Sequence, residues 1–243
     1  MKRKSLRKIV NATSAIIHVP GIMALVSIAV ALIFGEYFAI TGFAILEVVT
    51  IVPGKLIHSS LPNEKLNISE TMIAATLSWL ISALAGTLPL IITAYSLDRV
   101  SADHAFVMGN LHSFIDAFFE SVSGFTSTGL SMVDEPSMLP HSMQWWRSFM
   151  QWIGGIGIIV FISGFSHPQI TPVESHYHKK YESKALPATT LDWKNVWWIY
   201  LLFTVIGIGY FLIMGRPLWE SINHGLSVIS TGGFTITEGG LQS

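Results

Sequence analysis

The sequence contains no cysteine and few charged residues. The absence of cysteine among its 243 residues excludes disulfide bonds, thiolate zinc sites and cysteine nucleophiles. Only 12% of the residues are charged, the net charge is -1, and no basic stripe with interleaved aromatic residues occurs, which excludes a basic nucleic-acid-binding protein. Hydrophobic residues instead make up 51% of the chain, far more than a soluble domain needs. We therefore expect an all-α polytopic membrane protein.

Five hydrophobic runs are long enough to form membrane-spanning helices, which need about 20 residues each. They are residues 16–34, 37–52, 71–95, 143–165 and 193–214. The first run follows a basic N-terminus, but it is too long for a signal peptide and lacks a small-x-small cleavage site, so we expect a retained helix.

Local signals mark where some of these helices begin, end or bend. Pro53-Gly54 should end the second helix, and Pro89 should kink the third. Asn67 or Ser69, together with Glu70, supplies capping chemistry for the third helix.

Two further segments, 111–122 and 217–229, are helical in pattern but too short to span a membrane. Each precedes a turn rich in hydroxyl groups and glycine, at 123–131 and 230–234. A short helix that enters and leaves on one side needs such a turn to be shielded by protein or to line water. Helix, glycine-bearing turn and spanning helix together predict an ion-filter architecture.

The distribution of cations favours one topology. With the N-terminus in the cytoplasm, all of the 14 lysines and arginines lie on the cytoplasmic side except Arg99, Arg147 and Arg216. This supports five spanning helices and two re-entrant segments, although a topology in which the short segments also span is not excluded. We expect four parts: 1–66, the cytoplasmic N-terminus and a peripheral helix pair; 67–167, a complete helix–pore loop–helix repeat; 168–192, a cytoplasmic linker; and 193–243, a partial second repeat.

The turns contain a repeated tripeptide. Ser127-Thr128-Gly129 and Ser230-Thr231-Gly232 lie 103 residues apart, each after a short helix. The tripeptide alone is common, but its recurrence in the same structural context indicates a pore assembled from several copies of one unit.

Three segments resemble the Trk/Ktr superfamily of potassium-uptake proteins, most closely the Trk type. They are FESVSGFTSTGLS at 119–131, WRSFMQWIGGIGIIV at 146–160 and HGLSVISTGGF at 224–234. The resemblance implies a potassium-channel-like fold with four helix–pore loop–helix repeats in a pseudo-tetramer. Of these repeats, one complete copy and most of a second would lie in this chain, the N-terminal half.

The same resemblance implies a selectivity filter. Its residues would be Thr126, Ser127, Thr128, Gly129, Ser230, Thr231, Gly232 and Gly233. Carbonyl groups around Thr128, Gly129, Thr231 and Gly232 would coordinate dehydrated K⁺, for which neutral oxygens replace water. In this superfamily a serine at the first filter glycine accompanies sodium permeability, so the glycines here favour potassium.

The resemblance also implies partners and a location. We expect a homodimer in the lipid of a bacterial or archaeal cytoplasmic membrane. A cytoplasmic nucleotide-binding ring would regulate it, so the nucleotide would bind the partner and this chain would need no cofactor.

Several residues allow more than one interpretation. Gly124 is a candidate for close packing behind the filter, and Glu120, which shares a helix face with Asp116, would either concentrate cations or pair with Arg147. Arg147 would snorkel to the interface, bind the end of a short helix or act in gating.

Three other features have simple structural interpretations. The Gly-Gly-x-Gly run at 154–157 resembles a phosphate loop but suits close helix packing better. Glu47 within a spanning helix suggests a structural hydrogen bond, and the pair His176 and His178 suggests a solvated loop rather than a metal site.

Potassium uptake has two rivals. The chain would be a non-conducting assembly or regulatory subunit if it inserts without completing a pore. It would be an intramembrane enzyme if Asp116 and Glu120 acted on a substrate, although the sequence shows no nucleophile–base pair. We expect no enzymatic activity.

Overall fold

The computed structural model describes residues 3–99, 108–165 and 193–237, which form helices and connecting turns without any strand. The helices are α1 (Arg3–Ile16), α2 (His18–Ile33), α3 (Tyr37–Ser60), α4 (Ile68–Leu97), η1 (Gly109–His112), α6 (Phe114–Phe125), η2 (Pro136–Met138), α7 (His141–Phe165), α9 (Trp193–Ile213) and α10 (Leu218–Ile229). The expected all-α class is confirmed. The linker predicted at 168–192, with His176 and His178, lies outside the described residues.

Four stretches of the described residues are long and apolar enough to cross a membrane. They are 3–33, which joins α1 and α2, then α3, α4 and most of α9. The fifth predicted span, α7, has 25 residues, or about 37 Å of helix. This helix is less apolar than the others because it contains the polar residues Gln144, Arg147, Ser148 and Gln151. All four are buried against protein and so do not face lipid.

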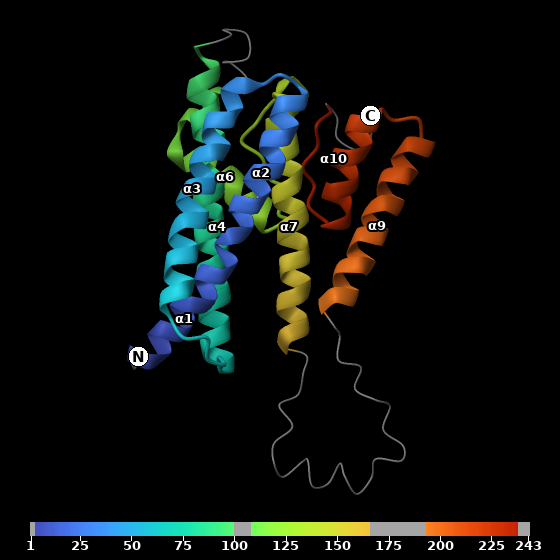
Figure 1. Ribbon diagram of the computed structural model, residues 1–243. Coiled ribbons are helices and arrows are strands. Elements are labelled where there is room, and N and C mark those ends of the chain that lie inside the picture. Colours follow the sequence, from blue (N-terminus) through green and yellow to red (C-terminus); the bar gives the residue numbers. More distant parts are fainter. Residues whose placement is uncertain (1–2, 100–107, 166–192, 238–243) are drawn as a thin grey trace, which may run out of the picture.

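The long helices stand side by side, and two short helices lie among them (Figure 1). Helix α6 packs on α4 and α7, whereas α10 packs on α9 and α7. Each short helix has 12 residues, or about 18 Å, well short of the ~30 Å hydrocarbon core. The predicted half-length helices are therefore confirmed, and α7 is the long helix that both of them contact.

The prediction that Pro53-Gly54 ends the second helix is wrong, because α3 continues to Ser60. A Cβ atom on Gly54 would lie 3.0 Å from the His18 ring, so α3 passes close to the junction of α1 and α2 at this point. Packing of α3 against α1 and α2 outweighs the loss of one backbone hydrogen bond at proline.

The basic N-terminus is also helical, and Pro20 explains why α1 and α2 are separate. Proline has no N–H to donate to the carbonyl four residues earlier, at Ile16. The helix is accordingly interrupted at Ile17. Helix α4, by contrast, continues through Pro89.

The capping prediction for the third helix is confirmed. The Asn67 side chain accepts a hydrogen bond from the Glu70 amide at 2.8 Å, and the Glu70 carboxylate accepts one from the Asn67 amide at 3.0 Å. This reciprocal pair is a capping box, and it fixes the start of α4 at Ile68.

Glu36 joins the α2–α3 hairpin to the start of α7. Its carboxylate accepts hydrogen bonds from the amides of His141 at 2.7 Å and Ser142 at 2.8 Å. Those amides lie in the first turn of α7, where no carbonyl of the same helix is available. The neighbouring Phe34 stacks on the His141 ring at 4.1 Å and meets Trp219 of α10 edge-on at 4.7 Å. The hairpin therefore holds both α7 and α10.

This contact predicts a stability effect. Glu36→Ala should lower the free energy of unfolding by about 2 kcal/mol, because two helix-terminal amides lose a charged acceptor. Denaturant unfolding of the full-length protein in detergent measures the change. Glu135→Ala, which removes an exposed carboxylate, is the matched control. Equal stability of the two variants would contradict the role of Glu36.

Candidate functional site

The two short helices occupy equivalent positions in a repeat of 104 residues. Helix α6 runs from Phe114 to Phe125 and α10 from Leu218 to Ile229, so both ends are displaced by 104. The helix predicted at 111–122 therefore begins and ends three residues later than expected. Gly124, expected in the turn, belongs to the last turn of α6.

The turns that follow have the same backbone conformation. Ser127 and Thr231 have positive φ angles of 54° and 55°, which residues other than glycine rarely adopt. Gly129 and Gly233 follow with φ angles of 79° and 96°. Gly129 is thus equivalent to Gly233, whereas aligning the repeated tripeptides pairs it with Gly232.

One pair of hydrogen bonds fixes each turn in the same way. In the first turn the amides of Ser127 and Thr128 donate to the carbonyls of Gly124 and Ser123 at 3.0 and 2.9 Å. In the second turn the amides of Thr231 and Gly232 donate to those of Val228 and Ser227 at 2.9 and 2.8 Å. Donors and acceptors again differ by 104 residues, so the structural repeat is independent of side-chain identity.

The carbonyl oxygens of these turns are available for another ligand. Within the described parts of the chain, no hydrogen bond ends on the backbone oxygens of Thr126, Ser127, Thr128, Gly129, Thr231, Gly232 or Gly233. The oxygen of Ser230 does accept one, from the Thr231 hydroxyl at 2.7 Å. Unpaired carbonyls are the groups that bind a dehydrated monovalent cation.

The two turns lie against each other. A Cβ atom on Gly129 would overlap the carbonyl oxygen of Gly232 and lie 3.0 Å from the Gly233 Cα. Glycine is required here twice over, for its φ angle and for this close approach. Residues about a hundred positions apart in the sequence thus form one site.

An ion pair between α6 and α7 supports the first turn. The Arg147 Nε lies 2.6 Å from the Glu120 Oε1, and the side chains are 2% and 0% exposed. The other Glu120 oxygen accepts the Met132 amide at 2.8 Å. Glu120 therefore pairs with Arg147, one of its two predicted roles, and the interpretation of Arg147 as a snorkelling residue is wrong.

Arg147 also reaches the second turn. Its Nη1 donates to the carbonyl of Thr235 at 3.3 Å, and its guanidinium carbon lies 4.3 Å above the centre of the Phe234 ring. A third contact, from Nη2 to the Ser131 hydroxyl, measures 2.9 Å. One guanidinium group thus holds the segments that follow both Gly129 and Gly233.

Gln151, one turn further along α7, supports the second turn. Its Oε1 accepts hydrogen bonds from the Ser227 hydroxyl at 2.7 Å and from the Phe234 amide at 3.2 Å. The Ser127 hydroxyl of the first turn donates to the backbone carbonyl of Gln151 at 3.2 Å. Sequence reasoning gave Gln151 no role, although an amide within an apolar run was a signal.

The glycines of α7 allow this close contact. A Cβ atom on Gly154 would overlap the Phe125 carbonyl, and one on Gly155 would lie 2.7 Å from the Ser230 Cβ. Gly124 of α6 similarly approaches Met150, with 3.0 Å from its Cβ position to the Met150 Cβ. The packing interpretations of the 154–157 run and of Gly124 are confirmed.

A hollow of about 370 Å³ opens directly outside the turns. Its lining residues are Gly129, Ser131, Val133, Asp134, Pro136, Arg147, Gly233, Phe234, Thr235 and Thr237. Arg147 is neutralised by Glu120, and Asp134 is exposed, with one long hydrogen bond of 3.5 Å from Asn110. Asp134 therefore gives the hollow a negative charge.

Two other carboxylates named from the sequence lie apart from the turns. Asp116 is half-buried on α6, and no ion pair within the described residues includes it. Glu47 is half-buried on α3, a different element from either short helix. At the position equivalent to Glu120, α10 has His224, which is buried and whose ring nitrogens find no hydrogen-bond partner in the described part of the chain.

Comparison with known proteins identifies relatives over most of the chain. Residues 38–243 match a family model described as TrkH, cation transport protein. The chain is 29% identical, over 98% of its length, to an uncharacterized cation transporter of Methanocaldococcus jannaschii, of which it covers 47%. It is 31% identical, over 72% of its length, to the Trk system potassium uptake protein TrkH of Escherichia coli K12, of which it covers 35%.

The fold agrees with a solved structure. The crystal structure of the potassium transporter TrkH from Vibrio parahaemolyticus matches 98% of this chain with a TM-score of 0.71 and 26% identity. That match covers 45% of the solved chain. The chain thus spans about half the length of the two relatives that match nearly all of it.

The Arg147–Glu120 pair predicts a non-additive stability effect. Arg147→Met should destabilise the full-length protein by about 3–5 kcal/mol, because it leaves a buried carboxylate unpaired. Combining it with Glu120→Gln, which keeps an acceptor for the Met132 amide, should restore much of that loss. Denaturant unfolding of the single and double variants in detergent measures this. A strictly additive cycle would rule out the buried pair.

Proposed function

Since the chain belongs to the TrkH family of cation transport proteins, we propose that it provides part of a filter for potassium uptake across the cytoplasmic membrane. The observation that supports this most strongly is the pair of adjoining turns with the same backbone and unpaired carbonyl groups. The relatives are named as transporters, which fits a protein without enzymatic activity.

The turns have the chemistry that potassium requires. An ion that sheds its water needs neutral oxygens at several positions, and backbone carbonyls supply them. The first turn offers the carbonyls of Thr126, Ser127, Thr128 and Gly129, and the second offers those of Thr231, Gly232 and Gly233. The carbonyl of Ser230, the remaining proposed filter residue, also accepts the Thr231 hydroxyl. We propose that the carbonyl groups of Thr128, Gly129, Thr231 and Gly232 coordinate the ion. We add Gly233 to this set because its backbone corresponds to that of Gly129. Potassium is the cargo here and not a resident cofactor.

Two turns form only part of a ring around an ion. Because the chain spans about half of its relatives, the other walls of the pore come from further helix–pore loop–helix units. These further units would face the two turns of this chain across the axis of the pore. A homodimer and a cytoplasmic nucleotide-binding ring complete the proposed assembly, with the nucleotide on the ring.

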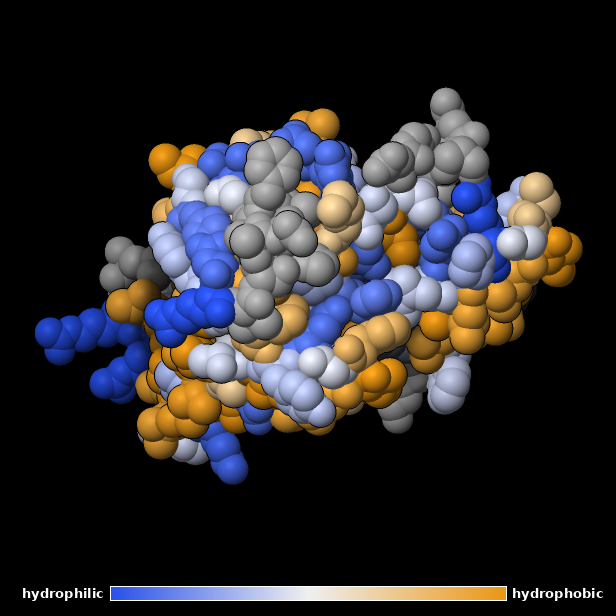
Figure 2. Space-filling model, turned by 90° about the horizontal axis from the view of Figure 1, so that it is seen from above, coloured by the Kyte–Doolittle hydropathy of each residue, from blue (hydrophilic) through white to orange (hydrophobic). Residues whose placement is uncertain are grey.

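The proposed orientation places the turns near the outer surface and the N-terminus in the cytoplasm. The N-terminus and the α3–α4 link lie at one end of the bundle, and the segments after the two turns, which line the hollow, lie toward the other (Figure 1). Figure 2, which looks down on that other end, shows hydrophilic residues across the middle of the face and hydrophobic ones mainly at its edges. This pattern suits an ion entrance surrounded by lipid-facing helices.

The filter predicts sensitivity at one glycine. In the full-length protein, Gly129→Ala should reduce ⁸⁶Rb⁺ uptake into proteoliposomes by at least about ten-fold, because a strained backbone costs on the order of 1–3 kcal/mol and the new methyl group displaces the Gly232 carbonyl. Gly109→Ala is the control, since its Cβ atom meets nothing within 4 Å.

Three outcomes of this experiment separate the hypotheses. Loss of flux in Gly129→Ala alone supports the filter, and equal flux in both variants contradicts it. No flux in the unmodified protein, together with co-purification of a conducting transporter, would instead favour a non-conducting assembly subunit.

Asp134 predicts an effect on apparent affinity. Asp134→Asn should raise the Rb⁺ concentration for half-maximal uptake about two- to three-fold at low ionic strength, without changing the maximal rate, because an exposed charge concentrates cations at the entrance. The difference should vanish at high choline chloride, where screening shortens the range of the charge. Glu135→Gln, an exposed neighbour that does not line the hollow, is the control. An equal effect of both variants would refute the specific role of Asp134.

A further inference from the structure

Helix α1 buries several polar residues against the protein and exposes several apolar ones. Asn11, Thr13 and Ser14 are no more than 5% exposed. The Asn11 amide donates to the Pro62 carbonyl at 3.1 Å, in the link between α3 and α4. On the outside, Leu6 is 50% exposed and Val10 is 36% exposed. A helix of this kind requires an apolar environment on its outer side.

Cations flank the exposed apolar residues. Arg3 and Arg7 are exposed and lie four positions apart, as do Leu6 and Val10, so the four side chains share one face of α1. We call these four residues the outer face of α1. No aspartate or glutamate occurs in α1.

Arg3 and Arg7 differ from the other two cations of α1, which have an acidic partner among the described residues. Lys4 and Lys8 both approach Glu64, at 3.3 and 3.5 Å. Within the described residues no ion pair includes Arg3 or Arg7. The positive charge of the outer face is therefore not compensated within the described protein.

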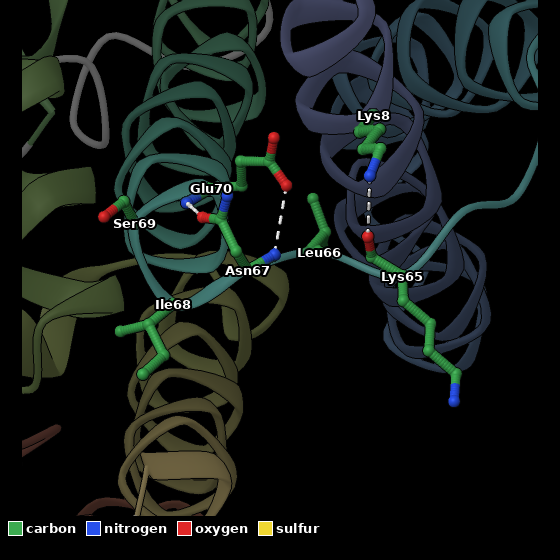
Figure 3. Close-up of a pocket in the computed structure, with 7 residues that line it drawn as sticks. All are labelled: Lys8, Lys65, Leu66, Asn67, Ile68, Ser69 and Glu70. Carbon is green, nitrogen blue, oxygen red and sulfur yellow. Dashed lines mark hydrogen bonds between the residues drawn. The ribbon is translucent and has the colours of Figure 1, made fainter. Parts of the chain in front are cut away.

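Several groups that line the adjacent hollow, of about 520 Å³, are hydrogen-bonded to one another. Figure 3 shows Lys8 directed at the Lys65 carbonyl, with a contact of 3.0 Å, while Asn67 and Glu70 bind each other and the Lys65 amine points away. The outer face of α1 is therefore a cationic surface separate from this hollow.

The length of the N-terminal helices places the outer face at the membrane surface. Residues 3–33 form one candidate span of 31 residues, or about 46 Å of helix, whereas the hydrocarbon core is ~30 Å thick. Helix α2 begins at His18 without a loop, and α1 slants away from it at the end of the bundle where the α3–α4 link also lies (Figure 1). The excess length is α1, which must lie at the boundary of lipid and water.

We infer that the outer face of α1 binds the headgroups of anionic phospholipids. Leu6 and Val10 insert among the upper acyl chains, and the guanidinium groups of Arg3 and Arg7 meet lipid phosphates, to which their planar donors are matched. A zwitterionic lipid offers the same acyl chains without net negative charge, so the charge of the lipid decides the preference. This inference needs insertion in a membrane but does not depend on ion transport.

These 243 residues contain no cysteine, so an introduced cysteine is a local probe once any cysteine elsewhere in the full-length protein is replaced by serine. Leu6→Cys in the full-length protein is labelled with a small fluorophore and reconstituted with brominated phosphatidylglycerol or brominated phosphatidylcholine at equal mole fraction. Quenching reports which lipid lies beside α1. We expect phosphatidylglycerol to be enriched at least about five-fold, since each cation near an anionic surface strengthens binding by roughly that factor.

Two paired variants remove the same charge from different faces. Arg3→Gln with Arg7→Gln should abolish the enrichment, whereas Lys4→Gln with Lys8→Gln should retain most of it, because Glu64 already offsets those lysines. Equal quenching by the two lipids, absence of quenching by either, or an enrichment that survives loss of both arginines would overturn the inference. Rb⁺ uptake by the same samples is a separate readout, so failure of transport and failure of lipid binding are distinguishable.

Discussion

The buried contact between Arg147 and Glu120 is the interaction on which the candidate filter depends. Turns that keep their carbonyls free for an ion cannot use those groups to stabilise themselves, so side chains must hold them. Burying two charges is costly unless each is paired and hydrogen-bonded. Here the guanidinium is shared among Glu120, Ser131 and Thr235, so the group that neutralises the carboxylate also fixes the segments after both turns.

This arrangement makes α7 the central helix of the described structure. It must pass within hydrogen-bond distance of both turns, which explains the glycines at 154 and 155 and the buried polar stripe that includes Gln151. The two repeats have the same backbone conformation, but different side chains stabilise their turns. Glu120 of the first repeat corresponds to His224 in the second, whose ring nitrogens have no hydrogen-bond partner among the described residues. The surroundings of the candidate filter are therefore asymmetric even where its backbone repeats.

The helix hairpin of α2 and α3, expected to be peripheral, contributes directly to the geometry of the site. Glu36 caps α7, and the aromatic contacts of Phe34 continue to Trp219 at the start of α10. The outer ends of the hairpin, α7 and the second short helix are thereby tied together. At the opposite end of the bundle, α1 precedes the hairpin, and the lipid contact that we propose for α1 would give the N-terminal segment a second role there.

The sequence by itself determined the elements of this protein. Long apolar runs, two helices too short to span and hydroxyl-rich turns with glycine are local features, and each of them predicts its own structure because backbone hydrogen bonds must be satisfied within a membrane. The Asn67–Glu70 capping box was equally local. Two features of the helices were not: the continuation of α3 past Pro53, and the three-residue shift of α6, where packing outweighs propensity.

Only the tertiary structure decided which residues meet. The alignment of Gly129 with Gly233 follows from φ angles and not from the repeated tripeptide. The contact of Arg147 with Thr235, 88 residues later, has no local signature, and neither do the bonds of Gln151 to the second turn or of Glu36 to α7. Such contacts depend on how helices distant in sequence pack together, and a pattern along one helix records that a residue is polar without recording what it touches.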